Sequence, residues 1–151
     1  MEKEKLLISS CFLGEFVKYD GYHNLLEDST LEKLKKRYTL YPICPEVEGG
    51  LLTPRIPCEL TSINPLQVIN KENQDKTKEF LLGATKALEL CKKEGISKAL
   101  LKANSPSCGN KTIYDGTFSG NKIQGKGVSV QLLIDNNIEV CSEEELERLI
   151  Y

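Results

Sequence analysis

Short apolar runs and amphipathic segments follow one another along most of this chain. The runs at 5–9 (KLLIS) and 97–101 (SKALL) predict short buried strands. Residues 38–43 (YTLYPI) predict a further strand, and Pro42 favours an edge position because proline has no backbone N–H to donate. Residues 138–140 predict a fourth strand, so the chain contains the strands of a small sheet.

The segments between and after these strands have the periodicity of helices. The clearest is 75–94, where apolar side chains recur every three or four positions and Gly95 supplies a stop. Ser142 and Glu145 form the pattern of a capping box at the start of the last helix. The other helices are predicted over residues 29–37, 125–136 and 142–150.

The order of strands and helices indicates the fold class. Alternation of the two predicts an α/β fold with a mostly parallel, doubly wound (Rossmann-like) sheet flanked by helices. A length of 151 residues suits one domain, so we expect a single domain over residues 1–151. The segment 45–65 is rich in Gly and Pro and predicts a long loop, and loops of that length are often functional.

The charged residues of the chain nearly balance. There are 20 Lys and Arg against 22 Asp and Glu, so the net charge is −2 and we expect no double-stranded nucleic acid partner. The N-terminal residues mix both charge signs, and only Leu6–Ile8 follow as an apolar run. This pattern predicts a cytoplasmic protein with no membrane partner, and nothing in it indicates an oligomeric state.

The cysteines are the residues that most need an explanation. A chain without an export signal keeps its thiols reduced, so we expect metal binding, catalysis or burial rather than disulfides. No Cys-x-x-Cys pair is present, and any shared site must therefore be assembled by the fold. The six cysteines are Cys11, Cys44, Cys58, Cys91, Cys108 and Cys141.

Three cysteines follow predicted strands in a way that predicts a common site. Cys11 lies just after the first strand, Cys44 directly after the second, and Cys108 in the loop that leaves the third. Ligands of open parallel sheets bind beyond the carboxyl ends of the strands, where such loops converge. Three thiolates without an obvious fourth ligand suit an open metal site, either zinc or an iron–sulfur cluster.

The remaining cysteines have other expected roles. Cys91 lies on the apolar stripe of the long helix and predicts a core position. Cys58 follows Pro57 in the long loop, and we expect it not to be a ligand. Cys141 also follows a strand and is the main rival for a fourth ligand.

Several short motifs, in a fixed order along the chain, identify a family. With these motifs the chain resembles the domain-of-unknown-function family 523 (DUF 523), which includes TudS-like thiouracil desulfidases. The motifs are SCFLG at 10–14, YDG at 19–21, CPEV at 44–47, GGL at 49–51, TPR at 53–55, NSPSCG at 104–109 and YDGTFSG at 114–120.

The resemblance implies a cofactor and a reaction. It implies a 4Fe-4S cluster on Cys11, Cys44 and Cys108, with one iron open to the sulfur of the substrate, and a cluster that is easily lost in air. The implied enzyme is a desulfidase with hydrolase-like C–S cleavage. It removes sulfur from a thiolated pyrimidine, a small molecule such as thiouracil, and gives the oxo compound and hydrogen sulfide without redox change.

The resemblance also implies the catalytic residues. Glu46, two residues after Cys44, matches the family's acid/base, and Ser105 matches a second functional position that hydrogen-bonds substrate or relays a proton. Glu48 is the rival carboxylate, with a solvated surface position as its simpler interpretation.

Other polar residues are candidates for substrate binding. Arg55 lies between Pro54 and Pro57 on a stiff segment, and its guanidinium can fork onto a carbonyl or phosphate. Ser107 and Asp20 are further candidates, although Asp20, like Asp115, also fits an Asx turn with the glycine that follows it.

Two other classes of function compete with the desulfidase. A non-enzymatic module could use a metal or cluster site for sulfur delivery or sensing. A thiol-based redox enzyme would need two cysteines that cycle through a disulfide. The glycine-rich segment after Cys108 matches neither a dinucleotide nor a Walker pattern, and we expect it to form a long loop that closes over the site.

Overall fold

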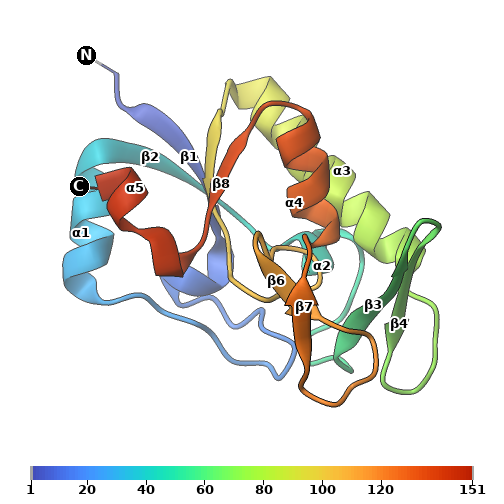
Figure 1. Cartoon of the computed structure of the whole chain (residues 1–151). Coiled ribbons are helices and arrows are strands. Elements are labelled where there is room, and N and C mark those ends of the chain that lie inside the picture. Colours follow the sequence, from blue (N-terminus) through green and yellow to red (C-terminus); the bar gives the residue numbers. More distant parts are fainter. Residues whose placement is uncertain (1, 151) are drawn as a thin grey trace.

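The computed structural model describes residues 2–150 and has a central sheet of four parallel strands (Figure 1). Their order is β2-β1-β5-β8, and every neighbouring pair is parallel. The predicted parallel α/β fold is confirmed, and β2 lies at the edge, as Pro42 indicated. The strands are β1 (Glu4–Ser9), β2 (Tyr38–Ile43), β5 (Lys98–Leu100) and β8 (Glu139–Cys141).

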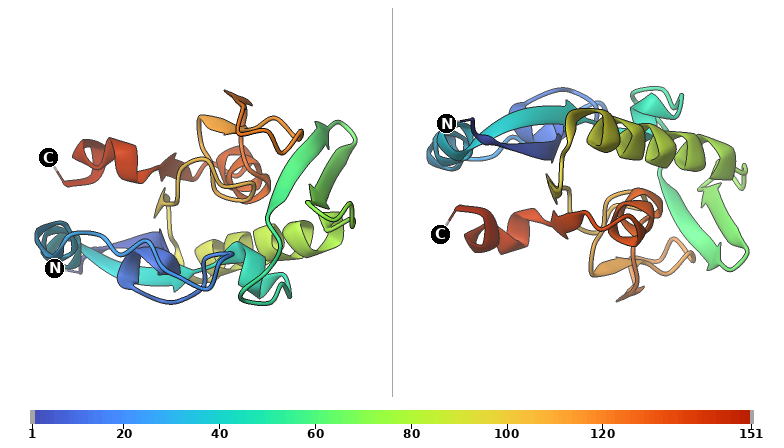
Figure 2. Two further views of the ribbon diagram at one scale, coloured as in Figure 1. Left: turned by 90° about the horizontal axis from the view of Figure 1, so that it is seen from below. Right: turned by 90° about the horizontal axis from the view of Figure 1, so that it is seen from above.

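Helices cover both faces of this sheet. In β1, Leu6 and Ile8 pack on the side of α1 and α5, whereas Leu7 packs on the side of α3 and α4. Figure 2 shows the two helix layers on opposite sides of the sheet. Both layers bury strand side chains, which explains why the strands are nearly continuous apolar runs. The helices are α1 (Asp28–Arg37), α3 (Thr77–Glu94), α4 (Val128–Asp135) and α5 (Glu147–Ile150).

The direction of winding changes at β1. From β1 the chain passes through α1 to β2 on one side, and later through α3 to β5 on the other side. The carboxyl ends of β1 and β5 therefore form a topological switch point, the usual ligand site of such sheets. A 3₁₀ helix, η1 (Ser10–Leu13), follows β1 directly at this point.

The segment 45–65 is not the long loop that the sequence predicts. It contains α2 (Pro45–Glu48) and β3 (Cys58–Ile63), and β3 pairs antiparallel with β4 (Leu66–Asn70). A four-residue helix and a strand with an irregular register carry no periodicity that sequence patterns detect.

The glycine-rich segment after Cys108 also differs from the prediction. It contains the antiparallel strands β6 (Thr112–Tyr114) and β7 (Lys122–Gln124), joined by the residues 115–121. Each strand has three residues, which is too short for alternation to be recognised among the glycines. The segment is therefore a hairpin and not a long irregular loop.

The backbones of α2 and α3 are in direct contact. A Cβ atom on Gly49 would overlap the carbonyl oxygen of Glu79, and one on Gly83 would overlap that of Pro45. Because neither glycine has a side chain, α2 lies against α3 without a layer of side chains between them. This contact holds the short helix that follows Cys44.

The C-terminal segment is tied to the loop that carries Cys108. The capping box of Ser142 and Glu145 is confirmed, but it opens η2 (Glu143–Glu145), and α5 begins only at Glu147. The Glu145 carboxylate also accepts a hydrogen bond of 2.7 Å from Asn110 Nδ2. Burial opposes its ionisation, but hydrogen bonds from Asn110 and the Ser142 N–H lead those that lower the pKa of Glu145 to about 2.

We predict that Glu145→Gln lowers the free energy of unfolding at neutral pH but not in strong acid. The pKa of Glu145 is below its ordinary value of 4.5, so its ionised form adds stability above pH 4.5. A difference of about 2.5 pKa units corresponds to about 3 kcal/mol, which disappears as the pH falls toward 2. Urea denaturation at pH 7, 4 and 2 measures the loss. Glu144→Gln on the exposed side of η2 is the control, and an equal loss at every pH would contradict the prediction.

Candidate active site at the carboxyl edge of the sheet

A cavity of about 400 Å³ lies at the carboxyl ends of β1, β2 and β5. It is lined by residues from the loops that follow these strands, together with residues from β3 and from the β6–β7 hairpin. Seven of the residues that the sequence singled out meet there: Cys11, Cys44, Glu46, Arg55, Ser105, Ser107 and Cys108.

All three candidate cysteines line the same cavity, with Cys11 and Cys108 buried and Cys44 half-buried. Asn24 Nδ2 donates to Cys11 Sγ at 3.4 Å, and the Cys44 thiol points to the carbonyl oxygen of Val17 at 3.9 Å. Burial raises the pKa of all three thiols, and Cys44 and Cys11 raise that of Cys108 further.

These donors match the ligand chemistry of an iron–sulfur cluster. Within residues 2–150, no three His, Cys, Asp or Glu side chains come close enough to hold a single metal ion. A cluster does not require the three sulfurs to meet at one point, because each cysteine binds a separate iron. The all-sulfur donor set around one cavity thus fits a cluster.

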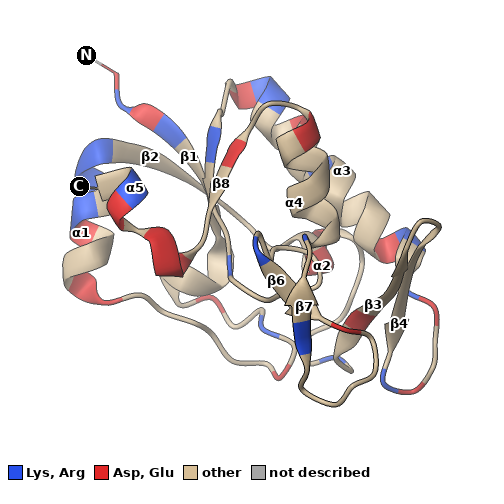
Figure 3. Ribbon diagram, in the orientation of Figure 1, with Lys and Arg blue, Asp and Glu red and all other residues tan. Residues whose placement is uncertain are grey.

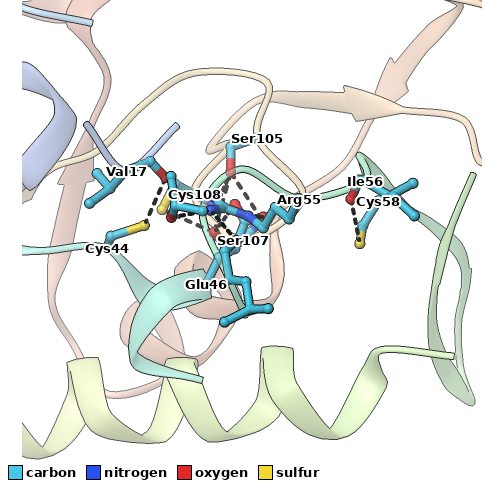
Figure 4. A network of polar contacts seen from close by, with 11 residues as sticks. Val17, Cys44, Glu46, Arg55, Ile56, Cys58, Ser105, Ser107 and Cys108 are labelled. Carbon is cyan, nitrogen blue, oxygen red and sulfur yellow. Dashed lines mark hydrogen bonds and ion pairs between the residues drawn. The ribbon is translucent and has the colours of Figure 1, made fainter. Parts of the chain in front are cut away.

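Glu46 lines the cavity, and α2 places it there. Its side chain is only 14% exposed, and its Oε1 accepts from Arg55 Nε at 3.3 Å (Figure 4). Its Oε2 accepts from Ser107 Oγ at 3.5 Å. Burial raises the pKa of Glu46 although Arg55 and Ser107 oppose this shift. Glu48, the rival carboxylate, is exposed and does not line the cavity.

Arg55 is held as firmly as its carboxylate partner. Its side chain is 8% exposed, and Nη1 donates to the Leu52 carbonyl at 3.3 Å and to Thr53 Oγ1 at 3.2 Å. Its backbone N–H donates to the carbonyl of Tyr19 at 2.7 Å. The guanidinium is thus oriented toward Glu46 by the segment that precedes it.

The two serines of the Cys108 loop form a short polar chain. Ser105 Oγ accepts the backbone N–H groups of Ser107 and Cys108, each at 3.1 Å. Ser107 Oγ lies 3.2 Å from Ser105 Oγ and 3.3 Å from Cys108 Sγ. Because Ser107 also reaches Glu46, hydroxyl groups connect the carboxylate with Ser105 and with the thiol (Figure 4).

Asp20, a candidate for substrate binding, does not line the cavity. Its Oδ1 accepts the Tyr22 N–H at 3.0 Å, and its Oδ2 lies 3.5 Å from Lys18 Nζ. Asp115 likewise accepts the Thr117 N–H at 2.9 Å. Both residues form the Asx turns that the glycines after them indicated. The carboxylate of Asp20 is therefore engaged in a turn.

Comparison with known proteins identifies the family. The sequence model of the 2-thiouracil desulfurase family matches residues 6–145. This chain belongs to the 2-thiouracil desulfurase family. It is 42% identical to a solved structure described as a 4Fe-4S-dependent thiouracil desulfidase, TudS, and that match has a TM-score of 0.90 and covers 97% of this chain and 95% of the other.

A curated relative is similar over the full length as well. The uncharacterized protein YbbK of Bacillus subtilis (strain 168) is 38% identical over 152 residues, which cover 96% of this chain and 99% of YbbK. The resemblance to DUF 523 inferred from the motifs is confirmed by the family match and by the likeness to TudS. No helix within residues 2–150 is long and apolar enough to span a membrane.

Of the other three cysteines of this desulfurase-family chain, two lie in the core and one lines the cavity. Cys91 lies in the core, as predicted. Cys141, the last residue of β8, is fully buried on the α1 and α5 side of the sheet and does not line the cavity. Cys58 does line the cavity, but its thiol points to the Ile56 carbonyl at 3.8 Å and lies apart from Cys44 and Cys108 in Figure 4. Burial, followed by the charge of Glu46, raises the pKa of Cys58 to about 11.

Some residues of the site had no sequence signal. Asn24 contacts Cys11, and Lys102 lines the cavity with its Nζ 2.7 Å from Glu143 Oε2. Ser10 also lines it, and its buried hydroxyl has no hydrogen-bond partner within the described residues. Asn24 and Lys102 lie outside the family motifs, so only the folded chain reveals them.

We predict that the Glu46–Arg55 pair is coupled in stability. Arg55→Met leaves a buried carboxylate without its cation and should lower the free energy of unfolding by on the order of 3 kcal/mol. The double variant with Glu46→Gln should lose less than the sum of the two single variants. Urea denaturation of the four proteins measures the coupling. Thr53→Ala, which removes another partner of Arg55, is the control, and additive losses would show that the pair is not coupled.

Proposed function

We propose that this protein is a desulfidase that removes sulfur from a thiolated pyrimidine such as thiouracil. The observation that carries the proposal is one cavity in which three cysteines from three separate loops lie with a buried carboxyl group. Membership of the 2-thiouracil desulfurase family and the likeness to TudS support it. The cavity volume of about 400 Å³ falls in the range of small-molecule sites.

Cys11, Cys44 and Cys108 are the residues that would hold a 4Fe-4S cluster. When bound there, the cluster would supply Lewis acidity that polarises the thiocarbonyl group and favours departure of the sulfur. The net reaction adds water to the ring carbon and releases hydrogen sulfide, so C=S becomes C=O and no electrons are exchanged with a partner.

Glu46 is the group that moves protons in this proposal. As a base it takes one proton from the water that attacks the ring carbon and then gives this proton to the leaving sulfur. The second proton of the water leaves the new hydroxyl group when the carbonyl forms and completes hydrogen sulfide. Burial raises the pKa of Glu46, so its carboxyl holds a proton more readily than a solvated glutamate does. The guanidinium of Arg55 keeps Oε1 in place at 3.3 Å.

The serines extend the path that a proton can take. Ser107 Oγ contacts Glu46 Oε2 at 3.5 Å and Ser105 Oγ at 3.2 Å. Ser105 would hydrogen-bond the substrate or pass a proton to it, and fully buried Ser107 links it to the carboxylate. The hydroxyl chain thus joins the base to the edge of the cavity where Cys108 lies.

Serine in place of Cys11, Cys44 or Cys108 should abolish both cluster binding and activity. Each single variant removes one thiolate ligand, so protein reconstituted without oxygen should lose its brown colour, its iron and its sulfide release from 2-thiouracil. Cys58→Ser, which changes a thiol of the same cavity, and Cys141→Ser should keep all three properties.

Iron binding without sulfide release from any thiopyrimidine would contradict the proposed enzyme and favour a module for sulfur delivery or sensing. Sulfide release that survives complete removal of metal would contradict the cluster-dependent reaction.

Glu46→Gln should lower kcat for 2-thiouracil by about 100- to 10,000-fold, because the amide cannot take up the proton of water. Iron content should not change, since Glu46 is not one of the proposed ligands. Glu48→Gln, an exposed neighbour on the same short helix, should keep wild-type activity. Sulfide release under anaerobic conditions measures kcat, and full activity of the Glu46 variant would exclude its proposed role.

A further inference from the structure

The motif YDGTFSG at 114–120 lies at the site, but the proposed reaction does not use it. The segment connects β6 to β7, and three of its residues line the cavity: Tyr114, Phe118 and Gly120. The hairpin therefore forms a wall of the cavity. None of its three lining residues takes part in the proposed proton transfer, so we consider a role in binding.

A buried carboxylate on β3 holds this hairpin in place. Glu59 is 9% exposed, and its Oε1 accepts the backbone N–H of Gly116 at 2.9 Å and that of Phe118 at 3.2 Å. Gly116 has φ +90°, and a Cβ atom there would lie 2.7 Å from the Leu60 carbonyl oxygen. The loop thus sits directly on the backbone of β3.

Polar contacts within the loop give it a defined shape. The Asp115 N–H donates to the Asn121 carbonyl at 3.0 Å, and the Asp115 carboxylate accepts the Thr117 N–H at 2.9 Å. Asn121 Nδ2 donates to Ser119 Oγ at 3.0 Å. These bonds fix the loop before any ligand binds, which lowers the entropic cost of binding.

Phe118 has an unusual backbone conformation for its residue type. Its φ is +56°, in the left-handed region that glycine and asparagine adopt readily and that a bulky side chain rarely adopts. Such conformations persist where the surrounding structure holds them, and they concentrate at ligand sites. Here the bond to Glu59 holds the backbone, and half-buried Phe118 lines the cavity.

The ring of Phe118 differs from the other aromatic rings of the cavity. Lys122 Nζ lies 5.6 Å from the centre of the Tyr114 ring, and Lys18 Nζ lies 5.8 Å from that of Tyr19. Within residues 2–150, no aromatic ring or cation is placed against the Phe118 ring. Its π face has no partner of this kind and can take one from a ligand.

We propose that Phe118 is the platform on which the flat heterocycle of the substrate stacks, so that it determines the preference for ring thiocarbonyls over open-chain ones. Every pyrimidine has a π face, and stacking of a base on an aromatic side chain contributes substantially to binding. The inference rests on the proposed function for the identity of the ring, and on the geometry of the hairpin for the residue.

The variant Phe118→Asn removes the aromatic ring but keeps the backbone conformation accessible. Asparagine adopts a left-handed conformation readily, so the variant should melt at or above the wild-type temperature while it lacks the ring. We expect KM for 2-thiouracil to rise on the order of tenfold, with kcat within about twofold, because stacking acts equally in the ground state and the transition state. Phe118→Tyr, which keeps the ring, should retain the wild-type KM.

Two further measurements distinguish stacking from a structural role. The dissociation constant of uracil, measured by calorimetry on the reconstituted protein, should rise on the order of tenfold in Phe118→Asn. The KM for thiourea, which has no ring, should stay the same. Unchanged uracil affinity in this variant, or an equal loss for thiourea and thiouracil, would overturn the inference.

The calorimetric result also separates this inference from the proposed function. If the wild type releases no sulfide from any thiopyrimidine, the proposed function fails. The uracil affinities of the wild type and the Phe118 variants still decide whether the ring is a stacking platform. If the wild type does not bind uracil, the inference about Phe118 is overturned.

Discussion

Parallel pairing of β1 with both β2 and β5 is the constraint on which the whole site depends. Backbone hydrogen bonds place Ser9 opposite Ile43, and Ile8 opposite Leu100, so the three strands end at the same edge of the sheet. The chain then leaves each strand toward the same cavity, with the three candidate cysteines on the loops that follow. An antiparallel β2 would carry its cysteine to the opposite edge.

Burial on both faces maintains this pairing. Side chains of β1 alternate between the two helix layers. All three side chains from Leu6 to Ile8 are fully buried, whichever layer they face. A shift of one residue would exchange the two faces, and the register is therefore well specified. Figure 3 shows acidic and basic residues interspersed along the ribbon, in agreement with a net charge of −2. The structure thus separates an apolar scaffold from a small polar site.

The site itself combines burial with a buried ion pair. Burial raises the pKa of the three thiols and of Glu46, and the Arg55 guanidinium is paired with that carboxylate. The helix that carries Glu46 has four residues and is too short to be stable alone. Its position depends on the contact of two glycines with the backbone across the α2–α3 interface. The position of the proposed catalytic carboxylate thus depends on the close packing of α2 against α3.

The helix α3 was predictable because its period repeats several times over 18 residues, and the strands of the central sheet were predictable as short apolar runs. Cys11, Cys44 and Cys108 could be assigned to one site because each follows a strand of a parallel sheet. The elements α2, β3, β4, β6 and β7 were missed. The helix α2 has four residues, β3 and β4 pair with an irregular register, and β6 and β7 are three-residue strands among glycines. Asp20 was assigned to the substrate, but its carboxylate forms a turn.

The sequence by itself determined the fold class, the family and which three cysteines share one edge of the sheet, because periodicity and ordered motifs are local properties of the chain. Only the tertiary structure decided that Ser107 connects Glu46 to the Cys108 loop, that Cys141 is a core residue and that Phe118 lines the cavity. These contacts join segments that are distant along the chain, and the free energy of burial, which is not written in any local pattern, brings them together.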